Sequence, residues 1–431
     1  MKNKRKTLKQ LNLIKNVFLF ILIFILFSLP VLKQFYPITL FVIDNNLIFL
    51  KIIGSIGLFF LVINLYINFE KSENKKQYLK NLIPIFLLVL YMIWTFISAL
   101  FAENKELAFN GTKYRKEGYF TYLAYAGIFG LAFCIDSKKI KKTLLYSFLV
   151  IAIFTTILSR FAEQGFFNNL FWSINTNTAS FFQLNHYGYY LLIANAITCS
   201  LFITEKSKSL KILNLIIYSF LLYHLILNDT FGCYLALITN FIVFLIILMI
   251  KKEKKFPIII LICTFILISV ISKFSTKAIN TNISTLKNDL RIIITSDPSD
   301  KQYLRAGTGR MKLWINGLNF FAEKPILGYG PENLEKKYIK AGISQDRPHN
   351  ILIQLATTSG APGLILYISS VIIILWRSFK LFNTKNLLHT VCMFTIVAYL
   401  ISAMFGNSMY YTSPYYFILL GFLFYELINI K

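Results

Sequence analysis

The chain has 431 residues, of which 56% are hydrophobic and 42 are Phe. Its mean hydropathy is +0.60, and the apolar residues gather in runs of about 17–25, the length that a membrane-spanning helix requires. Soluble domains hold about 45–50% apolar residues. These features exclude a soluble globular enzyme, a disordered chain and a fibrous protein, and they predict an integral membrane protein with many spans.

The net charge of +26 arises from 45 Lys and Arg against 19 Asp and Glu. Six short basic segments hold 24 of the Lys and Arg, at 2–15, 71–80, 138–142, 206–211, 251–255 and 377–385. Short loops rich in Lys and Arg stay in the cytoplasm. The charge therefore predicts topology and attraction to anionic headgroups rather than binding of nucleic acid.

The apolar runs predict twelve spans in chain order. They lie at 13–32, 47–69, 82–101, 119–135, 144–159, 187–204, 212–228, 232–250, 256–273, 351–376, 387–405 and 414–430. An even number of spans after a basic N-terminus puts both termini in the cytoplasm. The expected fold is all-α, a polytopic membrane helical bundle. Its parts are nine spans in 1–273, an extracytoplasmic loop domain in 274–350 and three spans in 351–431.

The long segment 274–350 is expected to be partly helical. Apolar residues recur at helical spacing over Thr308–Glu323, which predicts a helix with Thr308 as its N-cap. A turn cluster rich in Gly and Pro follows, and then a polar helix is expected over Pro331–Lys340. A second interpretation of the first helix is that it lies on the bilayer with Trp314 at the interface.

Several Arg residues gather on the predicted outer side. The cationic candidates for binding pyrophosphate or glycan are Arg115, Arg160, Arg305, Arg310 and Arg347. Arg stays charged and binds phosphate oxygens through two parallel hydrogen bonds, so several Arg at one cavity would suit a pyrophosphate. Arg310 also lies in the first turn of a predicted helix, where free N–H groups favour an anion. The alternative is scattered contact with lipid headgroups.

Two of the four His residues lie on the predicted outer side. An imidazole titrates near neutral pH, so His349 could take a proton from a sugar hydroxyl as a catalytic base. His186 and Asn350 are substrate-binding candidates. The alternative for His349 is an interfacial residue at the entry of a span, and the residues alone leave both His186 and His349 as possible bases. His224 and His389 are expected to be structural.

Metal and disulfide chemistry find little support in the sequence. The nearest carboxylate cluster in the long loop is Asp297 with Asp300, and no Asp-x-Asp pair occurs in a predicted outer loop. Nucleotide-sugar chemistry usually needs paired carboxylates on a divalent ion, so neither a metal nor another cofactor is expected. The five Cys lie in apolar runs without Cys-x-x-Cys spacing, which predicts no disulfide framework.

Three stretches in the second half of the chain resemble one known family. They are Gly307-Thr-Gly309-Arg310-Met-Lys-Leu-Trp314, Lys324-Pro325-Ile-Leu-Gly328-Tyr-Gly330, and His349-Asn350-Ile-Leu-Ile-Gln354 followed by Gly360-Ala-Pro-Gly363. In this order, with a large loop between spans nine and ten, they resemble the O-antigen ligase and polymerase family. The resemblance covers most of the chain and is strongest over 305–365.

The resemblance implies a membrane glycosyltransferase that moves a glycan from undecaprenyl pyrophosphate to an acceptor hydroxyl. The reaction would be metal-independent and inverting, on the outer face of the bacterial cytoplasmic membrane. By resemblance, His349 activates the acceptor and Arg310 binds the donor pyrophosphate. The expected partners are the lipid-linked donor, a glycan or other surface acceptor, and membrane lipid, without nucleic acid.

The chain departs from the family at the start of span eight. Many members carry Ser-Arg-Gly there, whereas this chain has Thr230-Phe231-Gly232. Arg115 and Arg160 are the candidates to replace the missing Arg.

A transporter or flippase of lipid-linked glycans is the main alternative, since twelve spans would suit it. Such a protein would place ionisable residues near the bilayer midplane, where only His224 is expected here. A structural scaffold of an envelope assembly is a third hypothesis. Polymerase and ligase both stay open, because the two use the same donor and the same loop.

Overall fold

The computed structural model describes residues 2–32, 38–113, 115–163, 178–181, 183–297, 300–407 and 409–429, with backbone alone at 2–9, 38–46, 162–163 and 273–283. Within these residues the regular structure is entirely helical. The twelve predicted spans each coincide with a helix, although Ile430 of the last span lies outside the described residues. An all-α fold is therefore confirmed.

Twelve long helices form the bundle. They are α1 (Lys2–Leu32), α2 (Ile38–Lys71), α4 (Ile83–Leu100), α6 (Tyr119–Cys134), α7 (Lys138–Glu163), α8 (Leu184–Thr204), α9 (Lys208–Asn228), α10 (Phe231–Ile250), α11 (Phe256–Ile271), α16 (Ile351–Lys380), α17 (Leu387–Ala403) and α18 (Ser413–Asn429). In the described part of the chain, eight helices are long and apolar enough to cross a membrane, and α6, α11 and α17 are shorter apolar helices. The chain is a polytopic helical membrane protein.

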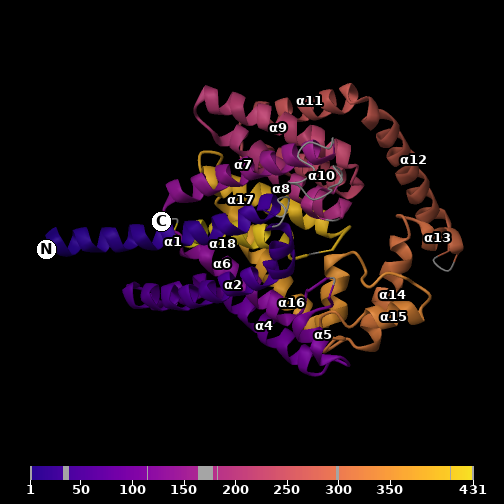
Figure 1. The fold of residues 1–431 in the computed structure, drawn as a ribbon, viewed down its shortest axis with the longest axis horizontal. Coiled ribbons are helices and arrows are strands. Elements are labelled where there is room, and N and C mark those ends of the chain that lie inside the picture. Colours follow the sequence, from indigo (N-terminus) through magenta and orange to yellow (C-terminus); the bar gives the residue numbers. More distant parts are fainter. Residues whose placement is uncertain are drawn as a thin grey trace.

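The two chain ends and the loop helices lie at opposite ends of the bundle. Both termini are at the left in Figure 1, whereas α12 (Lys273–Thr295), α13 (Lys301–Arg305), α14 (Arg310–Glu323) and α15 (Glu335–Lys340) gather at the right. Three short elements complete the fold: α3 (Lys75–Asn81), α5 (Lys105–Asn110) and the 3-10 turn Ala179–Phe181.

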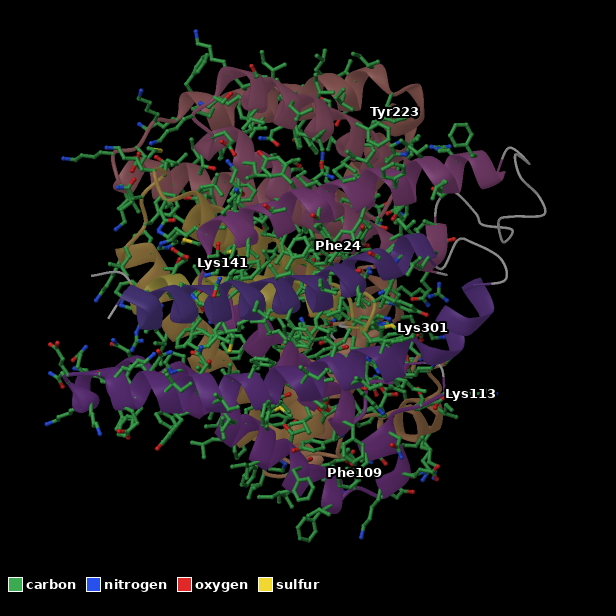
Figure 2. The ribbon with its side chains drawn as sticks, turned by 60° about the vertical axis from the view of Figure 1, so that its left-hand side comes forward. Phe24, Phe109, Lys113, Lys141, Tyr223 and Lys301 are labelled. Carbon is green, nitrogen blue, oxygen red and sulfur yellow. The ribbon has the colours of Figure 1, made fainter. Side chains whose placement is uncertain are left out.

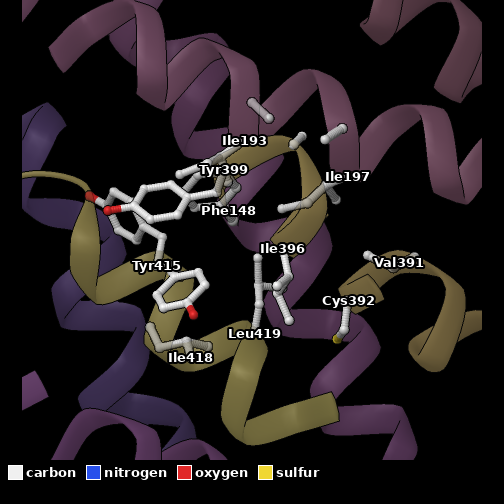
Figure 3. Packing of buried hydrophobic residues seen from close by; sticks show 14 of the residues in the cluster. Phe148, Ile193, Ile197, Val391, Cys392, Ile396, Tyr399, Tyr415, Ile418 and Leu419 are labelled. Atoms are coloured by element: carbon white, nitrogen blue, oxygen red, sulfur yellow. The ribbon is translucent and has the colours of Figure 1, made fainter. Parts of the chain in front are cut away.

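The core of the bundle lies around α8, which is buried along most of its length. Figure 3 shows Phe148 of α7, Ile193 of α8 and Tyr415 of α18 in this core, and the Phe148 and Tyr415 ring centroids are 5.0 Å apart. Asn195, Thr198 and Ser200 of α8 bond within their own helix, as when Asn195 Nδ2 donates to Leu191 O at 2.8 Å. Such bonds let polar side chains sit inside an apolar bundle at little cost.

The outer helices turn apolar side chains away from the bundle. Phe24 on α1 and Tyr223 on α9 are both exposed (Figure 2), as are Val89 and Ile93 on α4. In water such a surface would be unfavourable, but lipid chains solvate it. The inward core and the outward apolar surface together are what a membrane bundle requires.

The predicted helix in the loop domain is confirmed, and its N-cap is corrected. α14 begins at Arg310, and the N-cap is Gly309 rather than Thr308. Thr308 and Gly309 have φ +58° and +82°, so the chain makes a left-handed turn through both residues before the helix begins. Trp314 is half-buried, with its ring centroid 6.3 Å from that of Phe405, so it packs on the turn between α17 and α18.

The second predicted helix of the loop domain begins later than expected. The chain forms turns after Pro331, and α15 covers only Glu335–Lys340. Tyr338 on α15 is buried, and its hydroxyl donates to Leu313 O at 3.0 Å. This contact joins α15 to α14 in a small core of the loop domain's own.

A break inside α16 anchors the loop domain to the bundle. Gly360 has φ +67° and ψ −178°, a backbone region that is accessible essentially only to Gly. A Cβ atom at Gly360 would lie 1.9 Å from Ile326 O. The carbonyls of Thr357 and Thr358 each accept a hydrogen bond of 2.9 Å from the N–H groups of the 325–330 segment. The Gly-rich motifs therefore form the contact that joins the 325–330 segment of the loop to α16.

α4 also takes part in this contact between the loop and α16. The Trp94 indole N–H donates to Ser359 O at 2.8 Å, and the Ser98 hydroxyl donates to Leu327 O at 2.6 Å. These contacts join α4, α16 and the 325–330 segment. The residues that begin α16 are consequently held at a fixed place on the bundle.

Candidate functional site

Two loops that are distant in sequence meet where the loop domain joins the bundle. Arg115, in the loop after α5, donates from Nε and Nη2 to the two oxygens of Asp346 at 2.8 and 2.9 Å. Its Nη1 also lies 3.4 Å from the sulfur of Met409, between α17 and α18. The paired, planar geometry of this contact fixes the loop before α16 against the loop before α6.

A second buried ion pair lies beside the first. Arg347 donates from Nη2 to Glu332, and these two side chains are only 3% and 2% exposed. Arg347 Nε lies 3.7 Å from Asp346 Oδ2, so the two ion pairs form one network. Burial lowers the pKa of Arg347, and the nearby Glu117 carboxylate opposes that shift. Glu117 is itself fully buried and accepts a hydrogen bond from Tyr125.

His349 follows this network with a strained backbone. Its φ is +52°, which a residue other than Gly rarely adopts and which is often found at functional sites. Burial, followed by the charges of Arg310 and Arg115, lowers the pKa of His349 to about 4. Asp346 opposes this shift, and Arg347 adds to it. The imidazole is therefore neutral at pH 7, the form that can accept a proton.

Arg310 lies at the start of α14 and reaches toward the bundle. Its Nε donates to Phe405 O at 3.1 Å, and its Nη1 donates to Gly307 O at 3.2 Å and to Thr308 Oγ1 at 2.6 Å. Among the described residues, none accepts a hydrogen bond from Nη2. Arg310 is half-buried, and its guanidinium is held in place by these bonds. Its Nη2 can still donate hydrogen bonds to a ligand.

His186, in the first turn of α8, is 2% exposed, and neither ring nitrogen has a hydrogen-bond partner in the described part of the chain. Its ring centroid lies 5.8 Å from that of Tyr411. His186 also lies within electrostatic reach of Arg115, Arg347 and His349. A buried polar group without partners is costly, so His186 is a place where a bound group would be stabilised.

Asn350 caps α16 with its side chain. Its Oδ1 accepts hydrogen bonds from Leu352 N at 2.9 Å and from Ile353 N at 3.2 Å. The cap starts the helix directly after the left-handed His349, which explains why the two residues occur together.

Two of the predicted Arg residues lie apart from this cluster. Arg305 ends α13 and lines a cavity with Asp289 and Gln302, facing α12. Arg160, near the end of α7, lies within electrostatic reach of His224 and Tyr187. The structure therefore brings together His349, Arg310, Arg347, Arg115, Asn350 and His186.

An apolar cavity of about 350 Å³ lies next to the cluster. Its wall comes from α2, α4, α6, α16, α17 and α18 and includes several Tyr rings. Gln354, one turn into α16 from Asn350, lines it, as does Tyr125, the partner of Glu117. Gln354 Oε1 is buried without a hydrogen-bond partner among the described residues. The cavity therefore reaches from the polar cluster into the apolar bundle.

The cavity also reaches the lipid-facing surface. Val89 and Ile93 of α4 line it and are 48% and 51% exposed. An elongated apolar chain could therefore enter from the side of the bundle. Clefts of this kind, apolar with a few convergent polar groups, are typical ligand sites.

Sequence reasoning missed three carboxylates of the site, Asp346, Glu332 and Glu117. Asp346 and Glu117 lie within two residues of a predicted Arg, and that proximity was the available signal. Glu332 has no such neighbour in the sequence. Charge pairing between distant loops, however, depends on the fold. The sequence predicts these Arg residues as cations for a phosphate, yet Arg115 and Arg347 pair with carboxylates of the protein.

Comparison with known proteins agrees with the three motifs. Residues 216–368 match the family model described as O-antigen ligase. A Rickettsia conorii protein named "Putative polysaccharide ligase" is 27% identical over 302 residues, which are 65% of this chain and 64% of that protein. The match thus spans less than two thirds of the relative's length.

The fold and the site define a polytopic helical membrane protein with a buried charged cluster beside an apolar cavity. Residues 216–368 are similar to the O-antigen ligase family, and the predicted resemblance is confirmed. The matched range contains the whole loop domain and the first half of α16.

Proposed function

We propose that the protein is a membrane glycosyltransferase of the polysaccharide ligase or polymerase type. It would move a glycan from undecaprenyl pyrophosphate to an acceptor hydroxyl on the outer face of the bacterial cytoplasmic membrane. The family match supports the general class. The observation that carries the proposal is a neutral His349 facing the charges of Arg310 and Arg115 at one end of an apolar cavity.

Each group then has a role in the transfer. The acceptor oxygen attacks the anomeric carbon while the bond from that carbon to the pyrophosphate oxygen breaks. His349 takes the acceptor proton as the general base. The pyrophosphate leaves with the bonding electrons, and Arg310 stabilises the negative charge that develops there. His186 and Asn350 would contact the substrate beside His349.

Donor binding would also strengthen the base. The pKa of His349 is lowered partly by the positive charge of Arg310. A pyrophosphate between them would offset that charge and raise the pKa toward the ordinary value for His. The imidazole would thus become a better proton acceptor when the donor is in place.

The apolar cavity suits the lipid part of the donor. Its wall is almost wholly apolar, whereas the polar groups lie at the end that Gln354 and Tyr125 share with the charged cluster. A polyprenyl chain in the cavity would bring its pyrophosphate toward Arg310 and Arg115. The missing family Arg at span eight is then replaced by Arg115, which lies in the cluster, rather than by Arg160, which does not.

The test is bond formation by purified protein in vesicles with a lipid-linked glycan and two acceptors, a glycan and a non-glycan surface acceptor. An enzyme forms a new glycosidic bond, and the acceptor that is used separates polymerase from ligase. Movement of the donor across the bilayer without a new bond would instead show a transporter and would overturn the proposal.

In this assay Arg310→Gln is expected to lower transfer by about 10²–10³-fold, the usual effect of removing one donor to a developing anion. Lys301→Gln, on the exposed start of α13, is the matched control and should retain normal transfer. Equal rates for the two variants would remove Arg310 from the mechanism.

The acid limb of the pH profile is a second prediction. Because the pKa of His349 is lowered to about 4, kcat/KM should hold down to about pH 4 instead of falling near 6.5. The acid limb of kcat should lie at higher pH, since kcat reports the donor-bound enzyme.

An acid-stability control belongs to the same experiment. The lowered pKa of His349 contributes folding stability above pH 6.5, and that contribution is lost as the pH falls to about 4. Enzyme held at low pH must therefore recover full activity at pH 7. An acid limb of kcat/KM near 6.5 in enzyme that recovers would contradict the role of His349.

A further inference from the structure

α12 is an amphipathic helix that the sequence pattern of spans did not predict. Only Ser272 separates it from α11, one of the shorter apolar helices of the bundle. In Figure 1 it runs across the end of the bundle, from α11 toward α13, rather than along the spans. It therefore starts at the membrane surface and stays near the end of the bundle.

One side of α12 is an apolar stripe. Its described members recur at helical spacing and are Leu286, Leu290, Ile293 and Ile294. Leu290 is 50% exposed and Ile294 is 80% exposed. The opposite side faces α13, where Asn288 and Ile292 line a cavity with Arg305. Leu290 and Ile294 consequently point away from the rest of the protein.

Basic residues follow one edge of this stripe. Lys287 and Arg291 are exposed, and Arg291 also borders the cavity that Arg305 lines. Asp289 is the single acidic residue of α12, and it lies toward the opposite edge. An apolar face edged by Lys and Arg is the pattern of a helix that lies in a bilayer interface beside anionic headgroups.

The apolar stripe continues the lipid-facing surface of α11. Val270 and Ile271, the last residues of α11, are 64% and 65% exposed. The bilayer that covers them reaches the first turn of α12 directly. Membrane lipid is therefore the occupant that the position, the stripe and the charge favour together.

We propose that α12 is an interfacial helix that docks on the bilayer surface at the end of α11. The apolar stripe enters the boundary between headgroups and acyl chains, and Lys287 and Arg291 bind anionic headgroups. This surface lies outside the proposed transfer site, and the proposal holds whatever glycan the protein handles.

Docking of α12 also fixes the loop that leads to Arg310. Asp289 Oδ2 accepts a hydrogen bond of 2.9 Å from Gly307 N, three residues before Arg310. Gly307 has φ +63°, so the turn depends on a particular backbone conformation. A helix held on the membrane thus helps to position the start of α14 through this hydrogen bond.

The test uses the full chain in vesicles of phosphatidylcholine with phosphatidylglycerol. A Cys263→Ser parent removes the exposed Cys of the described part of the chain; the other four are buried. Leu290→Cys and Ile294→Cys are then labelled with an environment-sensitive fluorophore. Both labels should shift to shorter emission wavelength and should be quenched by lipids that carry a quencher near the headgroup.

Asn288→Cys, on the opposite side of the same helix, is the matched control and should report water. In the second arm, Lys287→Gln with Arg291→Gln should reduce the shift at Leu290→Cys in vesicles with phosphatidylglycerol but not in phosphatidylcholine alone. Equal, water-like emission from all three labels would overturn the proposal. A lipid-like shift that does not depend on Lys287 and Arg291 would overturn the headgroup contact.

Discussion

Replacement of His349 by Asn should lower the rate of glycan transfer by about 10²–10⁴-fold, the usual contribution of a general base. Asn tolerates the left-handed backbone that His349 adopts, but its amide cannot accept a proton near pH 7. The loss should lie in kcat, since the groups proposed to bind the donor are unchanged. Single-turnover measurement of glycosidic-bond formation, with donor in excess, provides the rate.

Gln345→Ala is the control for this variant, because Gln345 is exposed on the same loop and has no proposed role. It should transfer glycan at the normal rate. The His349→Asn protein should bind the donor as well as the parent and should melt at a similar temperature. Transfer within a fewfold of the parent would eliminate His349 as the base and leave His186 as the remaining imidazole of the cluster.

Glu332→Gln is expected to lower the free energy of unfolding by about 3–5 kcal/mol, because it removes the carboxylate charge that the buried Arg347 contacts directly. Both side chains of this pair are at most 3% exposed, so water cannot replace the lost partner. Thermal unfolding of the purified protein in detergent, followed through tryptophan fluorescence, measures the loss. Transfer should fall as well, since Arg347 lies two residues before His349.

Glu103→Gln is the matched control, because it breaks an ion pair with Lys336 in which both side chains are about 70% exposed. Exposed ion pairs contribute little, so its melting temperature should not change. The double variant Glu332→Gln with Arg347→Gln should recover part of the stability by removing both charges. If Glu332→Gln melts like the control, the network does not hold the loop.

The spans and the first loop helix could be predicted because local pattern specifies them. Apolar runs of membrane length coincide with helices in all twelve places, and the helical spacing before Glu323 gave α14. The exact start was missed because the N-cap depends on the backbone of Gly309 and not on the capping preference of Thr308. Similarly, turns persist after Pro331, and α15 begins only at Glu335.

Other features depend on contacts between distant segments. The role of the Gly-rich motif at Gly360 becomes visible only when Ile326 lies against it. The pairing of Arg115 with Asp346 joins residues 231 positions apart, which no local pattern reveals. α12 was missed because its apolar residues are too few for a span, although their spacing is helical. The separation of Arg160 from the cluster likewise follows from packing.

The apolar cavity opens laterally toward lipid at Val89 and Ile93. The substrate concentration that matters for binding is consequently the one within the membrane. A ligand that arrives through this opening diffuses in two dimensions, within a layer a few nanometres thick. Its abundance relative to other lipids, and not its amount per volume of buffer, then governs how often the protein encounters it. Diluting the membrane with inert lipid would therefore lower the rate at which the protein meets this ligand, even when the total amount of ligand in the sample stays constant.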